Sequence, residues 1–214
     1  TWSDATIGGG GGQSLQDITA PTLEECEKNP GAFLCPCQDN EDCYSGYCVP
    51  SSEGQVCTKT CEGLCPQGWS CKPDPSGAET SYICIEEAIN LCRPCQSNDE
   101  CQFFSHVGDR CVFVSDEVGS FCGTACEDQD DCREGYGCQE VADSDNGEMS
   151  LQCVKLDGEC ACSTRAVTEA ATTTCINAQC SGSRVCTEDG LSACNAPEPE
   201  AETCDGLDNN CDGQ

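Results

Sequence analysis

The sequence predicts small disulfide-rich modules in tandem, built from short β-hairpins and single helical turns with little regular secondary structure. The first observation is that 27 of the 214 residues are cysteine, a share of about 13% that is typical of a disulfide scaffold. The second is that Leu, Ile, Val and Phe together make up only about 14% of the chain, too little apolar surface to offset the entropy lost on folding. The third is that the cysteine spacing repeats.

The repeat extends from Cys37 to Cys153 and consists of four units of four cysteines each. The spacing is C-x5-C-x4-C-x8-C and C-x3-C-x5-C-x12-C in the first copy, then C-x5-C-x9-C-x10-C and C-x5-C-x5-C-x14-C in the second. A doublet precedes each copy, Cys35-Pro-Cys37 and Cys92-Arg-Pro-Cys95. We therefore expect a Gly-rich arm with a short helix (1–34), a first module (35–91), a second module that repeats it (92–159), a third module with an acidic linker (160–203) and an Asp/Asn-rich motif (204–214).

The N-terminal arm contains five consecutive glycines, Gly8 to Gly12. This composition is typical of a flexible linker, although an arm that docks onto a neighbouring molecule is also compatible with it. Residues Thr22 to Lys28 are expected to form a short helix that Asn29-Pro30 ends. Cys26 lies in this helix and belongs to no repeat.

Within the units, the first gap between cysteines is acidic and the last gap has the pattern of a hairpin. Ser97 followed by Glu100 fits a capping box for one helical turn, which we favour over calcium loops because a lone acidic turn has too few ligands. Gly54, Gly119 and Asn146-Gly147 each lie between two short apolar runs, and Asn-Gly predicts a two-residue turn. The spacing allows first-to-third and second-to-fourth pairing, as in epidermal-growth-factor-like modules. We expect Cys37–Cys48 and Cys43–Cys57, while other connectivities remain open.

From Cys160-Ala-Cys162 the spacing changes, which indicates the start of a third module. Its threonine-rich stretch from Val167 to Thr174 is expected to be a loop. Asn195 to Thr203 has the composition of an acidic, proline-containing linker.

The last stretch has the pattern of a calcium loop. Alternate oxygen-bearing residues followed by Gly213 match the first half of such a loop, since calcium prefers several hard oxygen ligands. The bidentate acid expected further on would lie past residue 214, so the natural chain either continues or holds calcium weakly. The competing interpretation is an Asx-rich turn closed by a Cys204–Cys211 disulfide. The candidate ligands are Asp205, Asp208, Asn210, Asp212 and Gln214.

The segment AETCDGLDNNCDG resembles the metal-binding motif named after the MopE surface protein, which recurs in large secreted bacterial proteins. The repeats of the type CPCQDNEDCYSGYC and CPQGWSC are similar to the cysteine-rich modules that accompany this motif. The resemblance implies a secreted bacterial cysteine-rich repeat protein. The copper associated with that family name is not expected here, because the motif has no histidine and its sulfur is expected to be oxidised.

The net charge and the high cysteine content limit the compartments, partners and metals that are expected for this protein. Disulfides persist in oxidising compartments, so we expect a secreted, extracellular or cell-surface protein with Thr1 as a processed terminus. A net charge of −30 disfavours nucleic acid and anionic membranes, and no apolar run is long enough to span a bilayer. Zinc and iron–sulfur clusters are disfavoured because Cys92–Cys95 is the only CxxC pair and His106 the only histidine.

We expect a non-enzymatic structural or adhesive protein that binds calcium at its C-terminal end. The odd cysteine count and the arm suggest self-association, including assembly into a fibre. One alternative is a surface protein that captures metal. The other is an inhibitor or cofactor of an extracellular enzyme, for which Val107–Arg110 is the candidate exposed loop. Catalysis by His106 or by a Cys92–Cys95 redox pair is disfavoured, because no nucleophile motif or βαβ pattern accompanies them.

Overall fold

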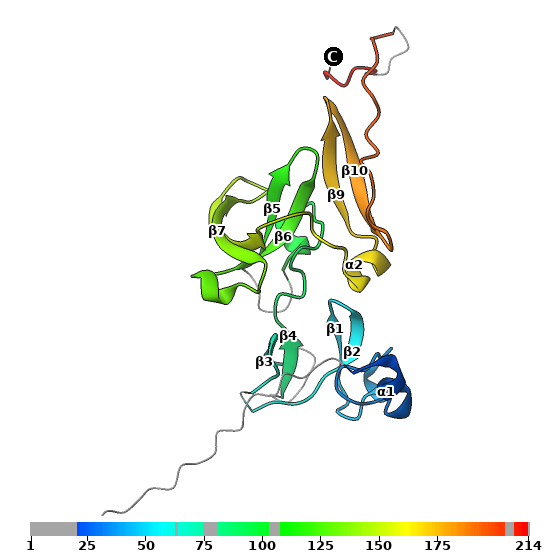
Figure 1. Ribbon diagram of the computed structural model, residues 1–214, viewed down its shortest axis with the longest axis vertical. Coiled ribbons are helices and arrows are strands. Elements are labelled where there is room, and N and C mark those ends of the chain that lie inside the picture. Colours follow the sequence, from blue (N-terminus) through cyan, green and yellow to red (C-terminus); the bar gives the residue numbers. More distant parts are fainter. Residues whose placement is uncertain (1–20, 63, 75–80, 103–107, 204–207, 214) are drawn as a thin grey trace, which may run out of the picture.

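The computed structural model describes residues 21–62, 64–74, 81–102, 108–203 and 208–213. Two short α-helices, three single turns of 3-10 helix and eleven short strands occur within these ranges, which confirms the expected fold class (Figure 1). In chain order they are α1 (Leu23–Lys28), η1 (Asn40–Asp42), β1 (Cys48–Ser51), β2 (Gly54–Cys57), β3 (Trp69–Pro73), β4 (Tyr82–Glu86), η2 (Asn98–Glu100), β5 (Arg110–Ser115), β6 (Gly119–Ala125), η3 (Gln129–Asp131), β7 (Tyr136–Ala142), β8 (Met149–Lys155), α2 (Thr164–Thr168), β9 (Thr172–Asn177), β10 (Cys180–Thr187) and β11 (Gly190–Leu191).

Side-chain caps start the short helices at the expected positions. In α1, Thr22 and Glu25 form a reciprocal capping box, and the helix ends before Asn29 as predicted. Asp39 and Asp128 cap η1 and η3 in the same way. The acids of these two turns therefore bind backbone N–H groups, which satisfies donors that a helix start leaves without a partner.

The predicted capping box at Ser97 is wrong in its contacts, although the helical turn η2 is present there. The Ser97 side chain accepts no capping hydrogen bond. Asp145 and Asp143 from a distant loop instead accept hydrogen bonds from the backbone N and the side-chain Nδ2 of Asn98, at 3.0 Å and 3.1 Å. A long-range contact has replaced a local one, which the spacing within the turn could not indicate.

Each of the four units contains an antiparallel hairpin in which the third and fourth cysteines face each other across the two strands. The facing pairs are Cys48 and Cys57, Cys71 and Cys84, Cys111 and Cys122, and Cys138 and Cys153. These facing cysteines do not bond to each other. Each bonds to a cysteine of the preceding segment, first to third and second to fourth, so that two disulfides fasten that segment to the hairpin.

The pairing predicted for the first unit, Cys37–Cys48 and Cys43–Cys57, is thus confirmed. Backbone hydrogen bonds repeat as well. The N–H groups of Leu34 and Cys92 donate to the carbonyls of Cys57 and Cys122, each at 2.8 Å. Leu34 and Cys92 both have φ near +70°, so the same tight entry into the module occurs twice.

One prediction about turns needs correction. Strands β7 and β8 pair from Tyr136 to Ala142, where Ala142 faces Met149, so residues 143–148 form a longer connection than the two-residue Asn-Gly turn expected. Asp143 closes this connection: its Oδ1 accepts from the backbone N–H groups of Asp145, Asn146 and Gly147 at 2.9–3.1 Å.

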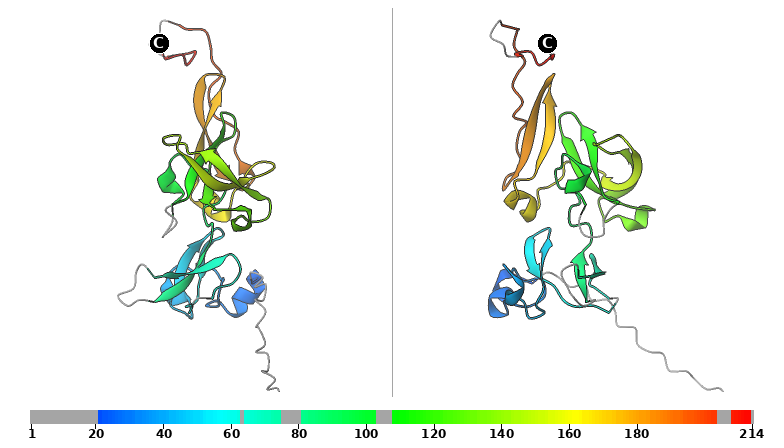
Figure 2. Two further views of the ribbon diagram at one scale, coloured as in Figure 1. Left: turned by 90° about the vertical axis from the view of Figure 1, so that its left-hand side faces the viewer. Right: turned by 180° about the vertical axis from the view of Figure 1, so that it is seen from behind.

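The second module contains the largest sheet, with strand order β5-β6-β8-β7. A bridge between Val112 on β5 and Asp143 at the end of β7 brings the two outer strands of this sheet together. The sheet therefore curls into a half-closed barrel, which is visible in the two views of Figure 2.

The third module contradicts the loop expected from Val167 to Thr174, because α2 covers its beginning and β9 its end. The hydroxyl of Ser163 accepts from the backbone N of Ala166 and starts the helix. The β-branched threonines that follow suit an extended strand, and Thr173 is fully buried.

The apolar core is thin, as the composition implied. Its main aliphatic cluster comprises Val49, Val56, Ile83 and Ile85 in the first module. The corresponding cluster in the second module consists of the four cysteines of its first unit. Sulfur thus takes the place that aliphatic side chains fill in most cores. Within the described residues, no helix has the length and hydropathy needed to cross a membrane.

Candidate functional site

Thirteen disulfides join all 26 cysteines of the described residues. The remaining cysteine of the sequence, Cys204, lies outside the described residues. Such a set of cross-links indicates an oxidising, extracellular environment. Cys92 and Cys95 do not pair with each other, because Cys92 bonds to Cys160 and Cys95 to Cys111.

The two disulfides of each unit lie close together, which creates four groups of three sulfur atoms within 4.8 Å of one another. Each group contains one whole disulfide and one sulfur of the second. As thiolates these groups could hold a metal ion, because thiolate is the form of cysteine that binds metals. As disulfides they instead act as covalent cross-links. The groups are Cys37, Cys43 and Cys57; Cys61, Cys65 and Cys71; Cys95, Cys101 and Cys122; and Cys126, Cys132 and Cys153.

Three disulfides connect segments that the spacing assigned to different parts of the chain. Cys26–Cys35 attaches α1 to the first module, Cys92–Cys160 joins the second module to the third, and Cys180–Cys211 attaches the C-terminal motif to β10. The Cys204–Cys211 disulfide proposed for the C-terminal turn is therefore wrong. Sequence order could not indicate this partner, because Cys180 lies 31 residues before Cys211.

Helix α2 lies where the three modules meet (Figure 1). The backbone N of Arg165 donates to the Ser52 carbonyl oxygen at 3.0 Å, and the Thr164 hydroxyl donates to Glu53 Oε2 at 2.8 Å. Both acceptors belong to the turn between β1 and β2 in the first module. The third module thus contacts the tip of the first hairpin with backbone and side chain.

The same end of the third module forms an ion pair with the second. Arg93 Nη2 lies 3.1 Å from Glu169 Oε2, and Arg165 Nε lies 2.8 Å from Glu169 Oε1. Burial raises the pKa of Glu169, but the hydrogen bonds and charges of Arg165 and Arg93 outweigh it, so the pKa is lowered overall. Glu169 therefore stays ionised between two arginines.

Strand β9 packs directly against β6. The Thr173 hydroxyl oxygen accepts from the backbone N of Ser120 at 2.6 Å. At Gly119, where φ is +99°, a Cβ would lie 2.5 Å from the Thr173 side chain. Only glycine allows this approach of the two modules without strain.

A further contact links the first and second modules. Glu86 is buried and accepts from both the backbone N and the hydroxyl of Ser52, at 2.7 Å and 2.8 Å. Arg133 of the second module lies 3.8 Å from Glu86 and donates to the Glu87 carbonyl at 2.6 Å. The junctions between modules are thus polar and paired, and they are supported by the Cys92–Cys160 bond.

The C-terminal motif is described from Asp208 to Gly213, so the predicted ligands Asp205 and Gln214 lie outside the described residues. The structure brings the other three together. Asp208 Oδ1 and Asn210 Oδ1 both accept from the backbone N of Asp212, at 3.1 Å and 2.9 Å, and Asn210 Nδ2 donates to Asp212 Oδ2 at 3.0 Å. Gly213 has φ +81°, which gives the sharp turn expected of glycine there.

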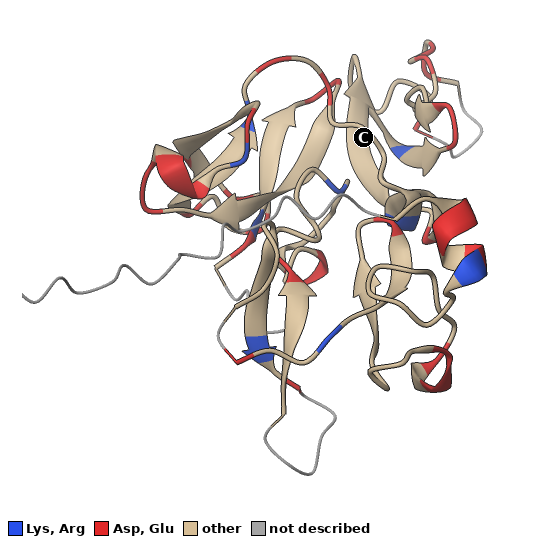
Figure 3. Ribbon diagram, turned by 60° about the horizontal axis from the view of Figure 1, so that its bottom comes forward, with Lys and Arg blue, Asp and Glu red and all other residues tan. Residues whose placement is uncertain are grey.

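These three side chains form an oxygen-rich turn, and oxygen atoms are the ligands that hard cations prefer. The rest of the described surface is acidic too, and Asp and Glu mark the helical turns and loops in Figure 3. Many of these acids accept hydrogen bonds from nearby backbone N–H groups, as Asp39, Asp128 and Asp143 do.

Two other candidates from the sequence are His106 and the Val107–Arg110 segment. His106 and Val107 lie outside the described residues, while Asp109 is buried and Arg110 begins strand β5. The described part of the Val107–Arg110 segment is therefore not an exposed inhibitory loop.

No protein-family model matches this chain, and neither a curated protein nor a solved structure matches it.

Proposed function

We propose that the chain is a secreted, non-enzymatic structural or adhesive component of a bacterial surface, in which disulfides hold the modules as one stiff unit. The observation that supports this most is that covalent bonds and paired polar contacts both cross the module boundaries, at Cys92–Cys160 and at Glu169 of α2. A structural spacer requires this kind of stiffness, whereas the composition alone would also allow modules joined by flexible linkers. The resemblance of the C-terminal motif to the MopE-type motif is consistent with a surface location.

Small-angle X-ray scattering of the oxidised chain tests the stiffness. The proposal predicts scattering that one fixed arrangement of the modules reproduces, together with resistance to trypsin at the junctions. An ensemble of freely rotating modules, with early cleavage after Arg165, would contradict it. The chain reduced and alkylated under denaturing conditions serves as the unfolded control.

Self-association is the second part of the proposal. Because 26 cysteines pair within the chain, Cys204 is the candidate for a bond to another subunit. The test measures the oligomeric state of the parent and of Cys204→Ser by sedimentation and by gel electrophoresis, with and without reductant. A dimer that reductant and Cys204→Ser both abolish supports assembly through sulfur. A monomer with one titratable thiol counts against it and leaves the N-terminal arm as the route of self-association.

The third part is calcium binding by Asp208, Asn210 and Asp212, together with Asp205 and Gln214. Calorimetry on the parent and on an Asp208→Asn/Asp212→Asn variant tests this, with Asp189→Asn in an exposed turn of the third module as the control. We expect a dissociation constant on the order of 10⁻⁴–10⁻³ M, as in extracellular calcium modules, that only the double variant abolishes. Absence of calcium-dependent heat in the parent would remove calcium from the proposal.

A second candidate function is metal capture, which the four groups of neighbouring sulfur atoms favour if their cysteines are reduced in the cell. The two functions differ in a simple measurement. Purification under non-reducing conditions followed by metal analysis should give less than one zinc or copper per chain for a structural protein, and about four for a metal-capture protein with one ion per group.

A further inference from the structure

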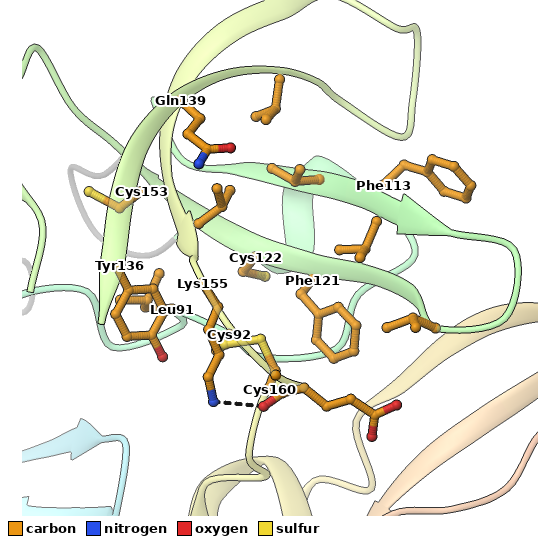
Figure 4. A pocket seen from close by; sticks show the side chains of 17 residues that line it. Leu91, Cys92, Phe113, Phe121, Cys122, Tyr136, Gln139, Cys153, Lys155 and Cys160 are labelled. Atoms are coloured by element: carbon orange, nitrogen blue, oxygen red, sulfur yellow. Dashed lines mark hydrogen bonds between the residues drawn. A yellow bond between two sulfur atoms is a disulfide. The ribbon is translucent and has the colours of Figure 1, made fainter. Parts of the chain in front are cut away.

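The second module contains an apolar pocket of about 230 Å³ in the mouth of the half-closed barrel (Figure 4). Aliphatic and aromatic side chains from all four strands line it, among them Val112, Phe121, Val141 and Val154. The Cys92–Cys160 disulfide also lines the pocket. Partly open barrels are a common location for small-ligand sites in proteins.

Cross-links fix the shape of this pocket. Besides Cys92 and Cys160, its walls include Cys122 and Cys153, which bond to Cys101 and Cys132 in the preceding segments. A wall fixed in this way loses little conformational entropy when a ligand binds. The pocket is therefore a preformed site.

One end of the pocket is polar. In Figure 4 the side chains of Lys155 and Tyr136 both extend toward the same end. Burial raises the pKa of Tyr136, with Arg133 opposing it, so its hydroxyl remains a hydrogen-bond donor at neutral pH. Glu159 also lines the pocket, and its carboxylate lies 3.6 Å from Arg184.

The ammonium group of Lys155 has bonding capacity left over. It donates to the backbone carbonyl oxygen of Glu159 at 2.6 Å, and a lysine has three donors. Among the described residues no carboxylate forms an ion pair with it. The remaining donors of this ammonium group lie at the polar end of an apolar cavity, where they can bind an external anion.

We propose that this pocket binds a small organic carboxylate, in which an aromatic or branched apolar group lies between Val112, Phe121 and Val154. The carboxylate accepts a hydrogen bond from the Lys155 ammonium group. The volume limits the size of the ligand: a cavity of about 150 Å³ accommodates benzene, so this one accommodates a single ring with a short acidic side chain. Nucleotides and long acyl chains are too large.

The first experiment compares 3-phenylpropionate with its neutral amide, 3-phenylpropanamide, as ligands of the oxidised full-length chain. Calorimetry or NMR titration at about 0.15 M salt limits the long-range repulsion by the acidic surface. We expect the acid to bind about tenfold more tightly than the amide. Equal affinities, or no binding of either probe at 10 mM, would overturn the proposal.

Two pairs of variants locate the ligand. Lys155→Met keeps the aliphatic stem and removes the charge, and it should abolish the preference for the acid but retain amide binding; Lys72→Met on β3 is the control. Val141→Phe should fill the pocket and abolish binding of both probes. Glu140→Phe adds a ring on the other face of the same strand and should bind as the parent does. Disulfide mapping of each variant is the control for folding. If the Val141→Phe variant still binds the probes, the ligand lies elsewhere and the proposal is contradicted.

Discussion

Removing the Cys92–Cys160 disulfide should weaken the attachment of the third module to the second. The bond spans 68 residues, but Cys101–Cys122 and Cys132–Cys153 shorten this loop. The shortest covalent path around it contains roughly 26 residues, and the chain-entropy relation then gives about 3.5 kcal/mol of lost stability. Without the shortening, the full loop would give about 4.4 kcal/mol.

The assay is calorimetric unfolding of a Cys92→Ala/Cys160→Ala variant at neutral pH, combined with hydrogen exchange. A loss of about 3.5 kcal/mol in a chain of this size corresponds to a midpoint lowered by about 7–14 °C. The fastest increase in exchange should occur in α2 and β9, because apart from the peptide chain their remaining contacts with the second module are noncovalent.

A matched control removes a disulfide within one unit. The Cys37–Cys48 bond spans 11 residues, and its loss should cost about 2.8 kcal/mol, with faster exchange confined to η1 and the first hairpin. The reasoning is refuted if the Cys92→Ala/Cys160→Ala variant unfolds at the parent's midpoint. It is also refuted if α2 keeps the parent's protection.

Two further predictions concern the module contact and the response to acid. Gly54→Ala should lower the free energy of unfolding by about 1–2 kcal/mol through backbone strain alone, since nothing lies within 4 Å of its Cβ position. Gly119→Ala should lower it by about 1–3 kcal/mol more, because the added methyl group overpacks against Thr173. Equal losses of stability in denaturant titrations of the two variants would contradict this. The backbone N–H of Asn146 and other hydrogen bonds lower the pKa of Asp143, so its stabilisation is present above the ordinary aspartate pKa of about 3.9 and disappears as pH falls through the lowered value. Asp143→Asn should therefore be less stable than the parent at pH 6, with a difference that shrinks toward pH 2; a constant difference in unfolding midpoint would exclude this role.

The sequence was most informative where structure is local. Short capped turns and hairpins follow from residues a few positions apart, so α1 and the hairpin from β1 to β2 could be predicted. The Cys37–Cys48 and Cys43–Cys57 disulfides could be predicted as well. The fold class followed from the high cysteine content and the scarcity of aliphatic residues.

Contacts between distant segments could not be predicted in this way. The Cys92–Cys160 and Cys180–Cys211 bonds depend on how modules pack, which spacing does not encode. The strand from Thr172 looked like a loop because its threonines are polar, yet Thr173 becomes buried against the neighbouring module. The apolar pocket was missed because its walls come from strands that lie side by side only after the sheet curls.

The candidate calcium ligands Asp208, Asn210 and Asp212 contact one another within one turn, while their role as metal ligands stays a prediction. The sequence could not show that the side-chain oxygens of Asp208 and Asn210 already accept hydrogen bonds from backbone N–H groups of the same turn. A cation would have to compete with those N–H groups, which is consistent with the weak affinity expected above.

The central claim is that paired sulfur atoms, rather than a large apolar core, hold this chain in one shape. Mass spectrometry of peptides produced without reductant, after alkylation of free thiols, tests it most directly. The account predicts thirteen cross-linked pairs, with first-to-third and second-to-fourth bonds in all four units and Cys92 joined to Cys160. Alkylated cysteines throughout these units, or zinc that is released together with their thiols, would contradict it.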